Sequence, residues 1–335
     1  MYNEVLFTHD DMDGAGCRIV FEVTHAKQPH EEWLVYNCTN QGISDDVNQA
    51  LDEGVIGEDT IVFFADITPN SETLNNLVGK VADILIFDHH ESAFWAEWVI
   101  GKDKAVIIPT NANGVMESGT SLLYKHYVDS SDVDDQLFNS SPTANFFTKL
   151  VDTIRSYDTY EWKKTGNQEA KNLMALFSLL GMENFCKRYR EMITAGINDG
   201  DSLITENDML FVQAKLDREQ RIIDKFGTDR VIPLKLAGYR VAFTVNVDFV
   251  NVSELAYQFL TKFGDEFDVF ISFSLSTGNF AIRALDVEGG PNTQEKIAVP
   301  LGGGGHPPAS GARISDEVKD EIIQKITKYL EDRLS

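Results

Sequence analysis

The chain has 335 residues, enough for one large domain or two ordinary domains, each with its own core. Hydrophobic residues make up 43% and charged residues 24%, which excludes a disordered or fibrous protein, and no stretch approaches the ~20 apolar residues of a membrane span. With 53 acidic and 29 basic residues, the net charge of −24 argues against a protein that binds long nucleic acid by neutralising its phosphates.

The N-terminus and the cysteines predict a soluble, cytoplasmic protein. The sequence MYNEVLFTHDD has neither a basic region nor a small-residue cleavage site, so we expect no signal peptide. Cys17, Cys38 and Cys186 stand far apart and are odd in number, which is typical of reduced core thiols.

The first part of the chain alternates short apolar runs with amphipathic stretches. We predict strands over 4–8, 33–36, 60–65, 84–87 and 105–108, and helices over 14–26 and 71–81. Apolar strands separated by helices indicate βαβ units and a parallel sheet with helices on both faces. From Ser118 to about Arg190 the pattern becomes helical, with helix starts at Ser118 and at Ser141-Pro142.

A charged helical segment over 205–226 suits a helix that connects two domains. Beyond it we predict strands over 231–236, 240–245, 269–275 and 280–285, and helices over 252–263 and 316–334. These elements predict a smaller α/β domain with a mixed sheet. The predicted limits are 1–198 for the first domain, 199–228 for the connecting helix or linker and 229–335 for the second domain.

Acidic and imidazole side chains follow three of the predicted strands. The first strand leads into His9–Asp13, the third into Asp66 and the fourth into Asp88-His89-His90. The carboxyl ends of parallel strands share one edge of the sheet, so we expect these side chains to converge. One such Asp would be a helix cap, but several carboxylates in one cleft would raise each other's pKa values unless cations held them. The pattern therefore predicts a metal site.

The ligand types also bear on the metal and the reaction. Carboxylates with one or two imidazoles and no thiolate suit Mn²⁺ or Mg²⁺ better than structural zinc. One carboxylate can bridge two ions about 3.5–4 Å apart, the spacing that activates a water and stabilises an in-line phosphoryl displacement. We therefore expect a two-ion centre that hydrolyses phosphate esters.

The second domain carries a run of four glycines, Gly302–Gly305, followed by His306. Glycine backbone N–H groups can approach an anion closely, and the imidazole can donate to a phosphate oxygen. Strand-like residues follow at 309–314, so we predict an ordered turn and not a flexible linker. Arg283, alone among apolar neighbours, is either an edge residue or a bidentate phosphate ligand.

The roles of two further features stay open. Gly119-Thr120-Ser121 opens a predicted helix, where it either binds a phosphate or takes part in helix capping. Six aromatic residues lie near the predicted site, and most of them should pack while one or two stack on bases. They are Phe94, Trp95, Trp98, Tyr157, Tyr160 and Trp162.

Four separated motifs resemble those of the DHH/DHHA1 phosphoesterase family, in the family's order and over nearly the whole chain. They are His9-x-Asp11-x-Asp13-Gly14, Asp66, Asp88-His89-His90 and Gly303-Gly304-Gly305-His306-x-x-Ala-Ser-Gly. Within the family, Tyr157–Trp162 is similar to a stretch of the nanoRNase B oligoribonucleases. The compact first motif, without the proline of many small-nucleotide members, is closer to nanoRNase B and to RecJ.

The resemblance implies a catalytic, metal-binding DHH domain and a substrate-binding DHHA1 domain, with the active site in the cleft between them. The implied ligands of two Mn²⁺ ions, or of Mg²⁺, are His9, Asp11, Asp13, Asp66, His89 and Asp158, with Asp13 or Asp66 as the bridge. Asp152 competes with Asp158 for the fourth motif. Asp88 would orient the imidazoles and His90 would contact the scissile phosphate. The implied substrate ligands are Arg283, Gly303, Gly304, Gly305 and His306.

The expected activity is that of a Mn²⁺-dependent phosphodiesterase, a 3′–5′ exoribonuclease-like enzyme that hydrolyses short oligonucleotides to mononucleotides. An enzyme for linear or cyclic dinucleotides, or for 3′-phosphoadenosine-5′-phosphate-type nucleotides, stays open, as does the cleavage polarity. A non-catalytic binding module is disfavoured because it would have no reason to retain repelling carboxylates. We expect neither long nucleic acid nor a membrane as a partner, and both a monomer and a homodimer stay open.

Overall fold

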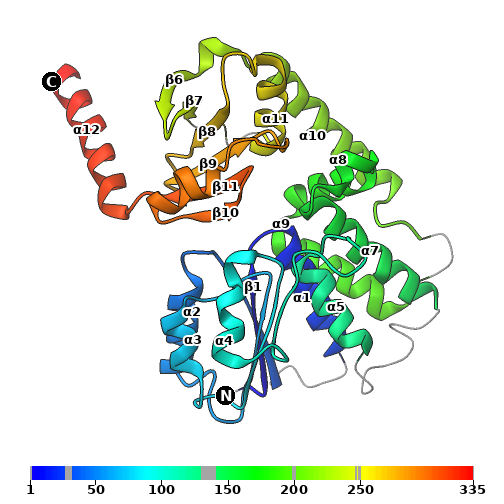
Figure 1. Cartoon of the computed structure of the whole chain (residues 1–335). Coiled ribbons are helices and arrows are strands. Elements are labelled where there is room, and N and C mark those ends of the chain that lie inside the picture. Colours follow the sequence, from blue (N-terminus) through cyan, green and yellow to red (C-terminus); the bar gives the residue numbers. More distant parts are fainter. Residues whose placement is uncertain are drawn as a thin grey trace. The chain divides into compact units, whose positions relative to one another are not determined.

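The computed structural model describes residues 2–26, 32–129, 141–197, 201–245, 247 and 250–334. The chain forms two compact units, Met1–Gln213 and Ala214–Ser335, and the boundary between them falls within helix α10 (Glu206–Asp224) (Figure 1). The predicted limits of 1–198, 199–228 and 229–335 stay a prediction.

The first unit contains a five-stranded sheet in the order β2-β1-β3-β4-β5, and all its neighbouring strands are parallel, as predicted. The strands are β1 (Glu4–His9), β2 (Trp33–Cys38), β3 (Ile61–Ala65), β4 (Asp83–Asp88) and β5 (Ala105–Ile107). Consecutive residues of β1 and β3 are buried, because helices cover both faces of the sheet.

Helices α2 (Ile43–Asp52), α3 (Ser71–Leu77) and α4 (Glu97–Ile100) cover one face of this sheet. On the other face lie α1 (Met12–Thr24), α5 (Gly119–Asp129) and α9 (Gln168–Ala195), with α7 (Pro142–Asp158) packed against all three. Short helices η2 (Glu91–Ala96) and α8 (Glu161–Thr165) follow β4 and α7. The helical pattern predicted from Ser118 to about Arg190 is confirmed over the described residues, and 130–140 lie outside them. Helix α2 was not predicted.

Capping side chains explain where the helices begin. Asp11 caps α1 by accepting from the Gly14 amide, so this helix starts two residues before the predicted position. Ser141 caps α7 with Pro142 in the first turn, as the sequence predicts. Among the described residues, no helix combines the length and the apolar character that crossing a membrane requires.

The second unit contains a six-stranded sheet in the order β10-β11-β9-β8-β7-β6. Its strands are β6 (Ile232–Leu236), β7 (Tyr239–Val245), β8 (Val269–Phe273), β9 (Asn279–Ala284), β10 (Gly304–His306) and β11 (Ala309–Arg313). The pair β7–β8 is parallel and the other pairs are antiparallel, so the predicted mixed sheet is confirmed. The helices are η3 (Thr228–Arg230), α11 (Val252–Phe263), η4 (Gln294–Ala298), η5 (Val299–Leu301) and α12 (Asp316–Leu334).

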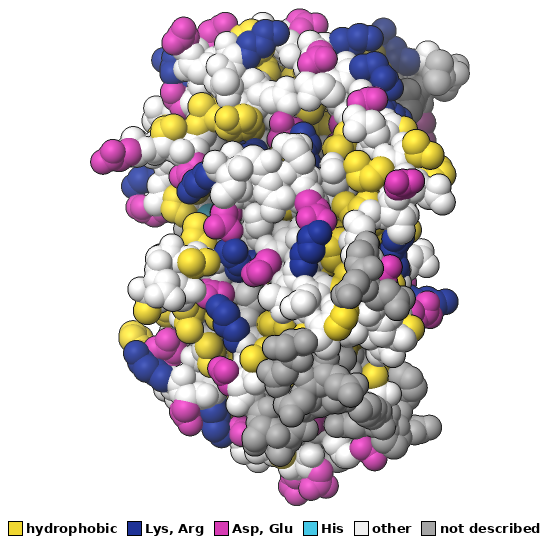
Figure 2. Space-filling model, turned by 90° about the vertical axis from the view of Figure 1, so that its right-hand side faces the viewer, with side chains coloured by type: hydrophobic (Ala, Val, Ile, Leu, Met, Phe, Trp, Pro, Cys, Tyr) yellow, Lys and Arg dark blue, Asp and Glu magenta, His cyan; other side chains and the backbone are white. Residues whose placement is uncertain are grey.

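The glycine run is ordered, as predicted, but part of it is a strand and not a turn. Gly304–His306 form β10, which pairs with β11. A Cβ at Gly303 would lie 2.8 Å from the Ala312 Cα, so only glycine fits this close approach. Figure 2 shows one face of the molecule, on which acidic and basic side chains are interspersed over most of the surface.

Candidate metal centre

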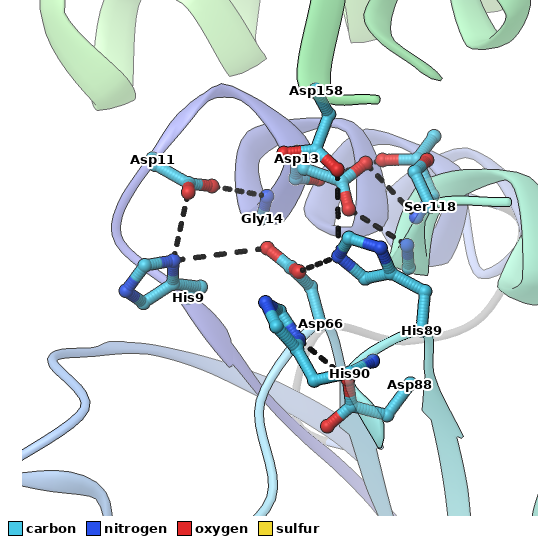
Figure 3. Close-up of polar contacts among 12 residues, drawn as sticks. His9, Asp11, Asp13, Gly14, Asp66, Asp88, His89, His90, Ser118 and Asp158 are labelled. Carbon is cyan, nitrogen blue, oxygen red and sulfur yellow. Dashed lines mark hydrogen bonds and ion pairs between the residues drawn. The ribbon is translucent and has the colours of Figure 1, made fainter. Parts of the chain in front are cut away.

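The first unit brings together the side chains that follow β1, β3 and β4, along with Asp158 at the end of α7 (Figure 3). Three overlapping groups each have their ligand atoms within 4.8 Å of one another. They are His9, Asp11 and Asp66; Asp13, His89 and Asp158; and Asp66, His89 and His90. Every ligand implied by the resemblance is therefore in the cluster.

Asp11 has two partners, one for each carboxylate oxygen. Oδ1 accepts the hydrogen bond from the Gly14 amide at 3.0 Å, and Oδ2 lies 2.8 Å from His9 Nδ1. The cap and the candidate ligand are thus the same side chain. Gly14 is required here because a Cβ at that position would overlap the His9 carbonyl.

Asp66 belongs to the first group and also lies close to His89 of the second group. Its Oδ2 is 3.8 Å from His9 Nδ1, and its Oδ1 is 3.3 Å from His89 Nε2. Its backbone has a φ of 62°, a left-handed conformation that an aspartate adopts at some cost, and its amide donates to the Phe87 carbonyl at 2.9 Å. The strained turn thereby directs one oxygen of Asp66 towards each group.

Asp13 is held by the first turn of α5. Its Oδ2 accepts from the Gly119 amide at 2.7 Å and its Oδ1 from the Thr120 amide at 3.2 Å. The Thr120 hydroxyl donates to the Asp13 carbonyl at 2.6 Å. The amides at the start of this helix therefore bind the Asp13 carboxylate. They are not available to a phosphate, which was one of the two alternatives left open by the sequence.

The structure also distinguishes between Asp158 and Asp152 as candidate metal ligands. Asp158 Oδ2 lies 3.4 Å from His89 Nε2, inside the cluster. The Asp152 side chain is 62% exposed and lies 3.7 Å from Arg155 Nε, outside the cluster. The geometry therefore favours Asp158 as the ligand of the fourth motif.

Asp88 orients His90. Its Oδ1 lies 2.7 Å from His90 Nδ1 and accepts from the His90 amide at 2.9 Å. Its Oδ2 accepts from the Thr68 hydroxyl at 2.7 Å. Thr68 was not predicted from the sequence. The signal that could have identified it is its position two residues after Asp66, in the connection between β3 and α3.

Burial and mutual repulsion set the protonation of the cluster. Burial, followed by the charges of Asp13 and Asp11, raises the pKa values of Asp66 and Asp158 well above the ordinary range. Burial opposes the charged form of His9, but the adjacent Asp11 outweighs it and raises the His9 pKa to about 9. Without a cation, the surroundings therefore disfavour the charged forms of Asp66 and Asp158.

The donor set fits divalent cations. The Oδ2 atoms of Asp66 and Asp158 are buried and have no hydrogen-bond partner among the described residues. Such atoms are costly unless a cation compensates them. The three cysteines are free and buried, and none belongs to the three ligand groups, so oxygen and imidazole ligands remain, as Mn²⁺ or Mg²⁺ prefer.

In the second unit, Arg283 and His306 lie in one row of the sheet. Ala309 of β11 pairs with Arg283 on one side and with His306 on the other. Arg283 donates from Nε to the Ser253 hydroxyl and from Nη1 to the Ser310 carbonyl, both at 2.9 Å. The register therefore places Arg283 and His306 on either side of Ala309, and hydrogen bonds fix the guanidinium. Of the glycines implied to bind substrate, Gly303 donates its amide to the Ala298 carbonyl at 2.8 Å.

The aromatic residues near the cluster have different surroundings. Trp162 is buried and stacks on Tyr157, with ring centroids 5.7 Å apart, so packing explains this pair. Phe94 is 41% exposed and Trp98 is 88% exposed. These two remain candidates for stacking on bases.

The two sheets and the strand-end cluster agree with what the resemblance to the DHH/DHHA1 phosphoesterases implies. Oligoribonuclease NrnB of Bacillus subtilis (strain 168) is 26% identical to the chain over 331 residues, which cover 95% of this chain and 74% of that protein. This similarity confirms the predicted resemblance to the nanoRNase B-type oligoribonucleases. No family model matches the chain.

Among solved structures, a protein from Helicobacter pylori G27 aligns at 18% identity and a TM-score of 0.40, over 94% of each chain. Exonuclease RecJ bound to manganese aligns at 11% identity and a TM-score of 0.47, over 97% of this chain and 89% of that chain. RecJ of Thermus thermophilus with Mn²⁺ aligns at 11% identity and a TM-score of 0.46, over 98% and 52%. At such TM-scores these likenesses say nothing about the site.

Proposed function

We propose that the chain is a Mn²⁺-dependent phosphodiesterase that hydrolyses short oligonucleotides to mononucleotides with two metal ions. The observation that carries this proposal is the carboxylate of Asp66, which has one oxygen facing each of two ligand groups. A carboxylate shared in this way would hold two cations, which together promote phosphoryl displacement.

The proposed ligands divide into two sets. His9, Asp11 and Asp66 would hold one ion, and Asp13, His89 and Asp158 would hold the other. Asp66 would join the second set through Oδ1, which lies 3.3 Å from His89 Nε2. When bound, the ions lower the pKa of a water molecule and neutralise charge that develops on the phosphate. The strained backbone of Asp66 and the amides that bind Asp13 fix these carboxylates before any ion arrives.

Other side chains would act on the substrate. Asp88 holds Nδ1 of His90 and thereby sets the orientation of the ring, and Nε2 would donate to an oxygen of the scissile phosphate. In the second unit, we propose that Arg283, His306, Gly304 and Gly305 bind the phosphates of the substrate, whereas the amide of Gly303 already donates to the Ala298 carbonyl. Three hydrogen bonds from Nε and Nη1 fix the Arg283 guanidinium, so Nη2 is the nitrogen that would donate to a phosphate oxygen and the bidentate alternative is disfavoured.

Two observations support a short substrate. The relative that covers most of the chain is named an oligoribonuclease. The net charge of −24 repels a polyanion, and acidic and basic side chains are interspersed on the face that Figure 2 draws. We further propose that the enzyme acts in the cytoplasm, without a membrane partner.

Cleavage efficiency should depend on substrate length and on salt. Each nucleotide beyond the bound end meets the negative field of the protein, which extends over a Debye length of about 8 Å at physiological ionic strength. We expect kcat/KM to be highest for about two to five nucleotides, to fall for ten- and twenty-mers, and to recover partly as salt is raised. RNAs of these lengths at low and moderate salt, with Mn²⁺ fixed, test this expectation.

Cyclic dinucleotides and nucleotide bisphosphates belong in the same experiment. Faster turnover of either one than of a trinucleotide would replace the proposed substrate within the same metal-dependent chemistry. A twenty-mer cleaved as well as the trimer, with steep inhibition by salt, would instead indicate an exonuclease that grips long strands.

A further inference from the structure

The first turn of α5 lies against two of the proposed ligands that come from different strands. Asp13 follows β1 and Asp66 follows β3, and both carboxyl groups are almost completely buried. We infer that Gly119 and Thr120 are positioning residues that fix Asp13 and Asp66 relative to each other. This inference rests on the proposed metal centre and adds residues to it that none of the four sequence motifs contains.

Gly119 acts on both aspartates. Its amide donates to Asp13 Oδ2 at 2.7 Å. A Cβ at this position would lie 2.6 Å from the Asp66 amide nitrogen and 2.7 Å from its Cα, and closer still to its Cβ. Because the nearest atoms include backbone and not a flexible side-chain end, an added methyl group must move Asp66, α5 or both.

Asp66 is sensitive to such a displacement. Its φ of 62° is a conformation that persists only when the surroundings enforce it. The amide of Asp66 pairs with Phe87 on one side, and Gly119 lies against its backbone on the other. A shift there would change the distances from the Asp66 oxygens to His9 and His89.

Thr120 hydrogen-bonds Asp13, and its hydroxyl also lies 3.7 Å from Cys17 Sγ. Its hydroxyl donates to the Asp13 carbonyl at 2.6 Å, and its amide lies 3.2 Å from Asp13 Oδ1. The Gly119 and Thr120 amides each use one lone pair of an Asp13 carboxylate oxygen and leave the other lone pairs for a cation. The two residues therefore predict different effects on the two proposed ion sites.

Three variants separate these roles. Gly119→Ala should weaken binding of both Mn²⁺ ions about 10- to 100-fold, the usual cost of disturbing groups that orient metal ligands. Thr120→Val should weaken only the ion that Asp13 would hold, and Thr120→Ser, which keeps the hydroxyl, should bind Mn²⁺ like the unaltered protein. Gly42→Ala is the matched control, because Gly42 caps another helix and its nearest neighbours are the ends of side chains.

The measurement is a Mn²⁺ titration of the chelator-treated full chain by calorimetry, with circular dichroism and thermal unfolding of the metal-free form alongside. Selective loss of one binding step in Thr120→Val, rescued in Thr120→Ser, supports the inference even if Gly119→Ala fails to fold. A purely structural role would lower thermal stability without separating the two steps. Unchanged Mn²⁺ binding in Thr120→Val and in folded Gly119→Ala would overturn the inference, whereas an unaltered protein that binds no Mn²⁺ would overturn the proposed function itself.

Discussion

Asp66→Asn is expected to lower kcat/KM at least about 10³-fold and to weaken both Mn²⁺ binding steps. The Asp66 carboxylate, the proposed bridge, has one oxygen near His9 and the other near His89, and an amide supplies neither its charge nor two equivalent oxygens. The loss of several kcal/mol of charge stabilisation at the reacting phosphate corresponds to this factor. Steady-state hydrolysis of a trinucleotide and a Mn²⁺ titration measure the two effects.

The same substitution should stabilise the metal-free protein. Burial, with Asp13 and Asp11 nearby, raises the Asp66 pKa, so its ionised form destabilises the folded state as pH rises above the usual value of 3.8. Asn removes that charge and tolerates a positive φ better. We expect the melting temperature at neutral pH to rise by about 2–4 °C for each kcal/mol recovered, with no difference near pH 3.

Asp13→Asn is the matched comparison. Its amide NH₂ would face the Gly119 or the Thr120 amide donor, so this variant should lose Mn²⁺ binding without any gain in stability. Equal stabilisation by both substitutions would show that the hydrogen bonds to Asp13 contribute little. Near-normal turnover in Asp66→Asn would remove Asp66 from the centre altogether.

Asp158→Asn is expected to reduce kcat/KM at least about 10²-fold, whereas Asp152→Asn should leave it within about twofold. The Asp158 carboxylate is buried beside His89, and the Asp152 side chain is mostly exposed beside Arg155. Both substitutions remove one negative charge from the same helix, so a general change in net charge cannot explain a difference between them.

Turnover and Mn²⁺ titrations of the two variants give the test. Because the Asp158 pKa is raised by burial and by Asp13, its Asn variant should also be at least as stable as the unaltered protein without metal. The reverse order of activities, with Asp152→Asn the inactive variant, would assign the fourth motif to Asp152.

The strand-end part of the cluster could be predicted from sequence because topology determines it. Once the strands before His9, Asp66 and His89 are parallel, their carboxyl ends share one edge of the sheet. Hydrophobic strands without polar alternation already indicated such a buried sheet. Both inferences use only the residue pattern of each strand and the general geometry of parallel sheets, and neither requires knowledge of tertiary packing.

Other parts of the site depend on packing that sequence does not encode locally. Asp152 and Asp158 are six residues apart on α7, which places them about 120° apart around the helix, so only one can face the cluster. Which one faces it depends on how α7 packs against α1 and α5. The contact of Gly119 with Asp13 joins residues 106 positions apart, and no local pattern marks it.

The glycine run shows a limit of another kind. Four glycines have low strand propensity, so an ordered turn was the natural prediction. The strand β10 forms because Gly303 and Gly305 allow a backbone approach to β11 that a Cβ would prevent. This strand can be recognised only from its pairing with Ala309–Gly311.

The central claim is that two divalent ions held by these carboxylates and imidazoles carry out phosphodiester hydrolysis. The most direct measurement is a Mn²⁺ titration of chelator-treated protein in which bound ions are counted while mononucleotide release from a trinucleotide is followed. The account predicts no release without metal, two Mn²⁺ bound per chain, and activity that rises with occupancy of the second site. Full activity in the metal-free protein, or saturation of both binding and activity at a single ion, would contradict it.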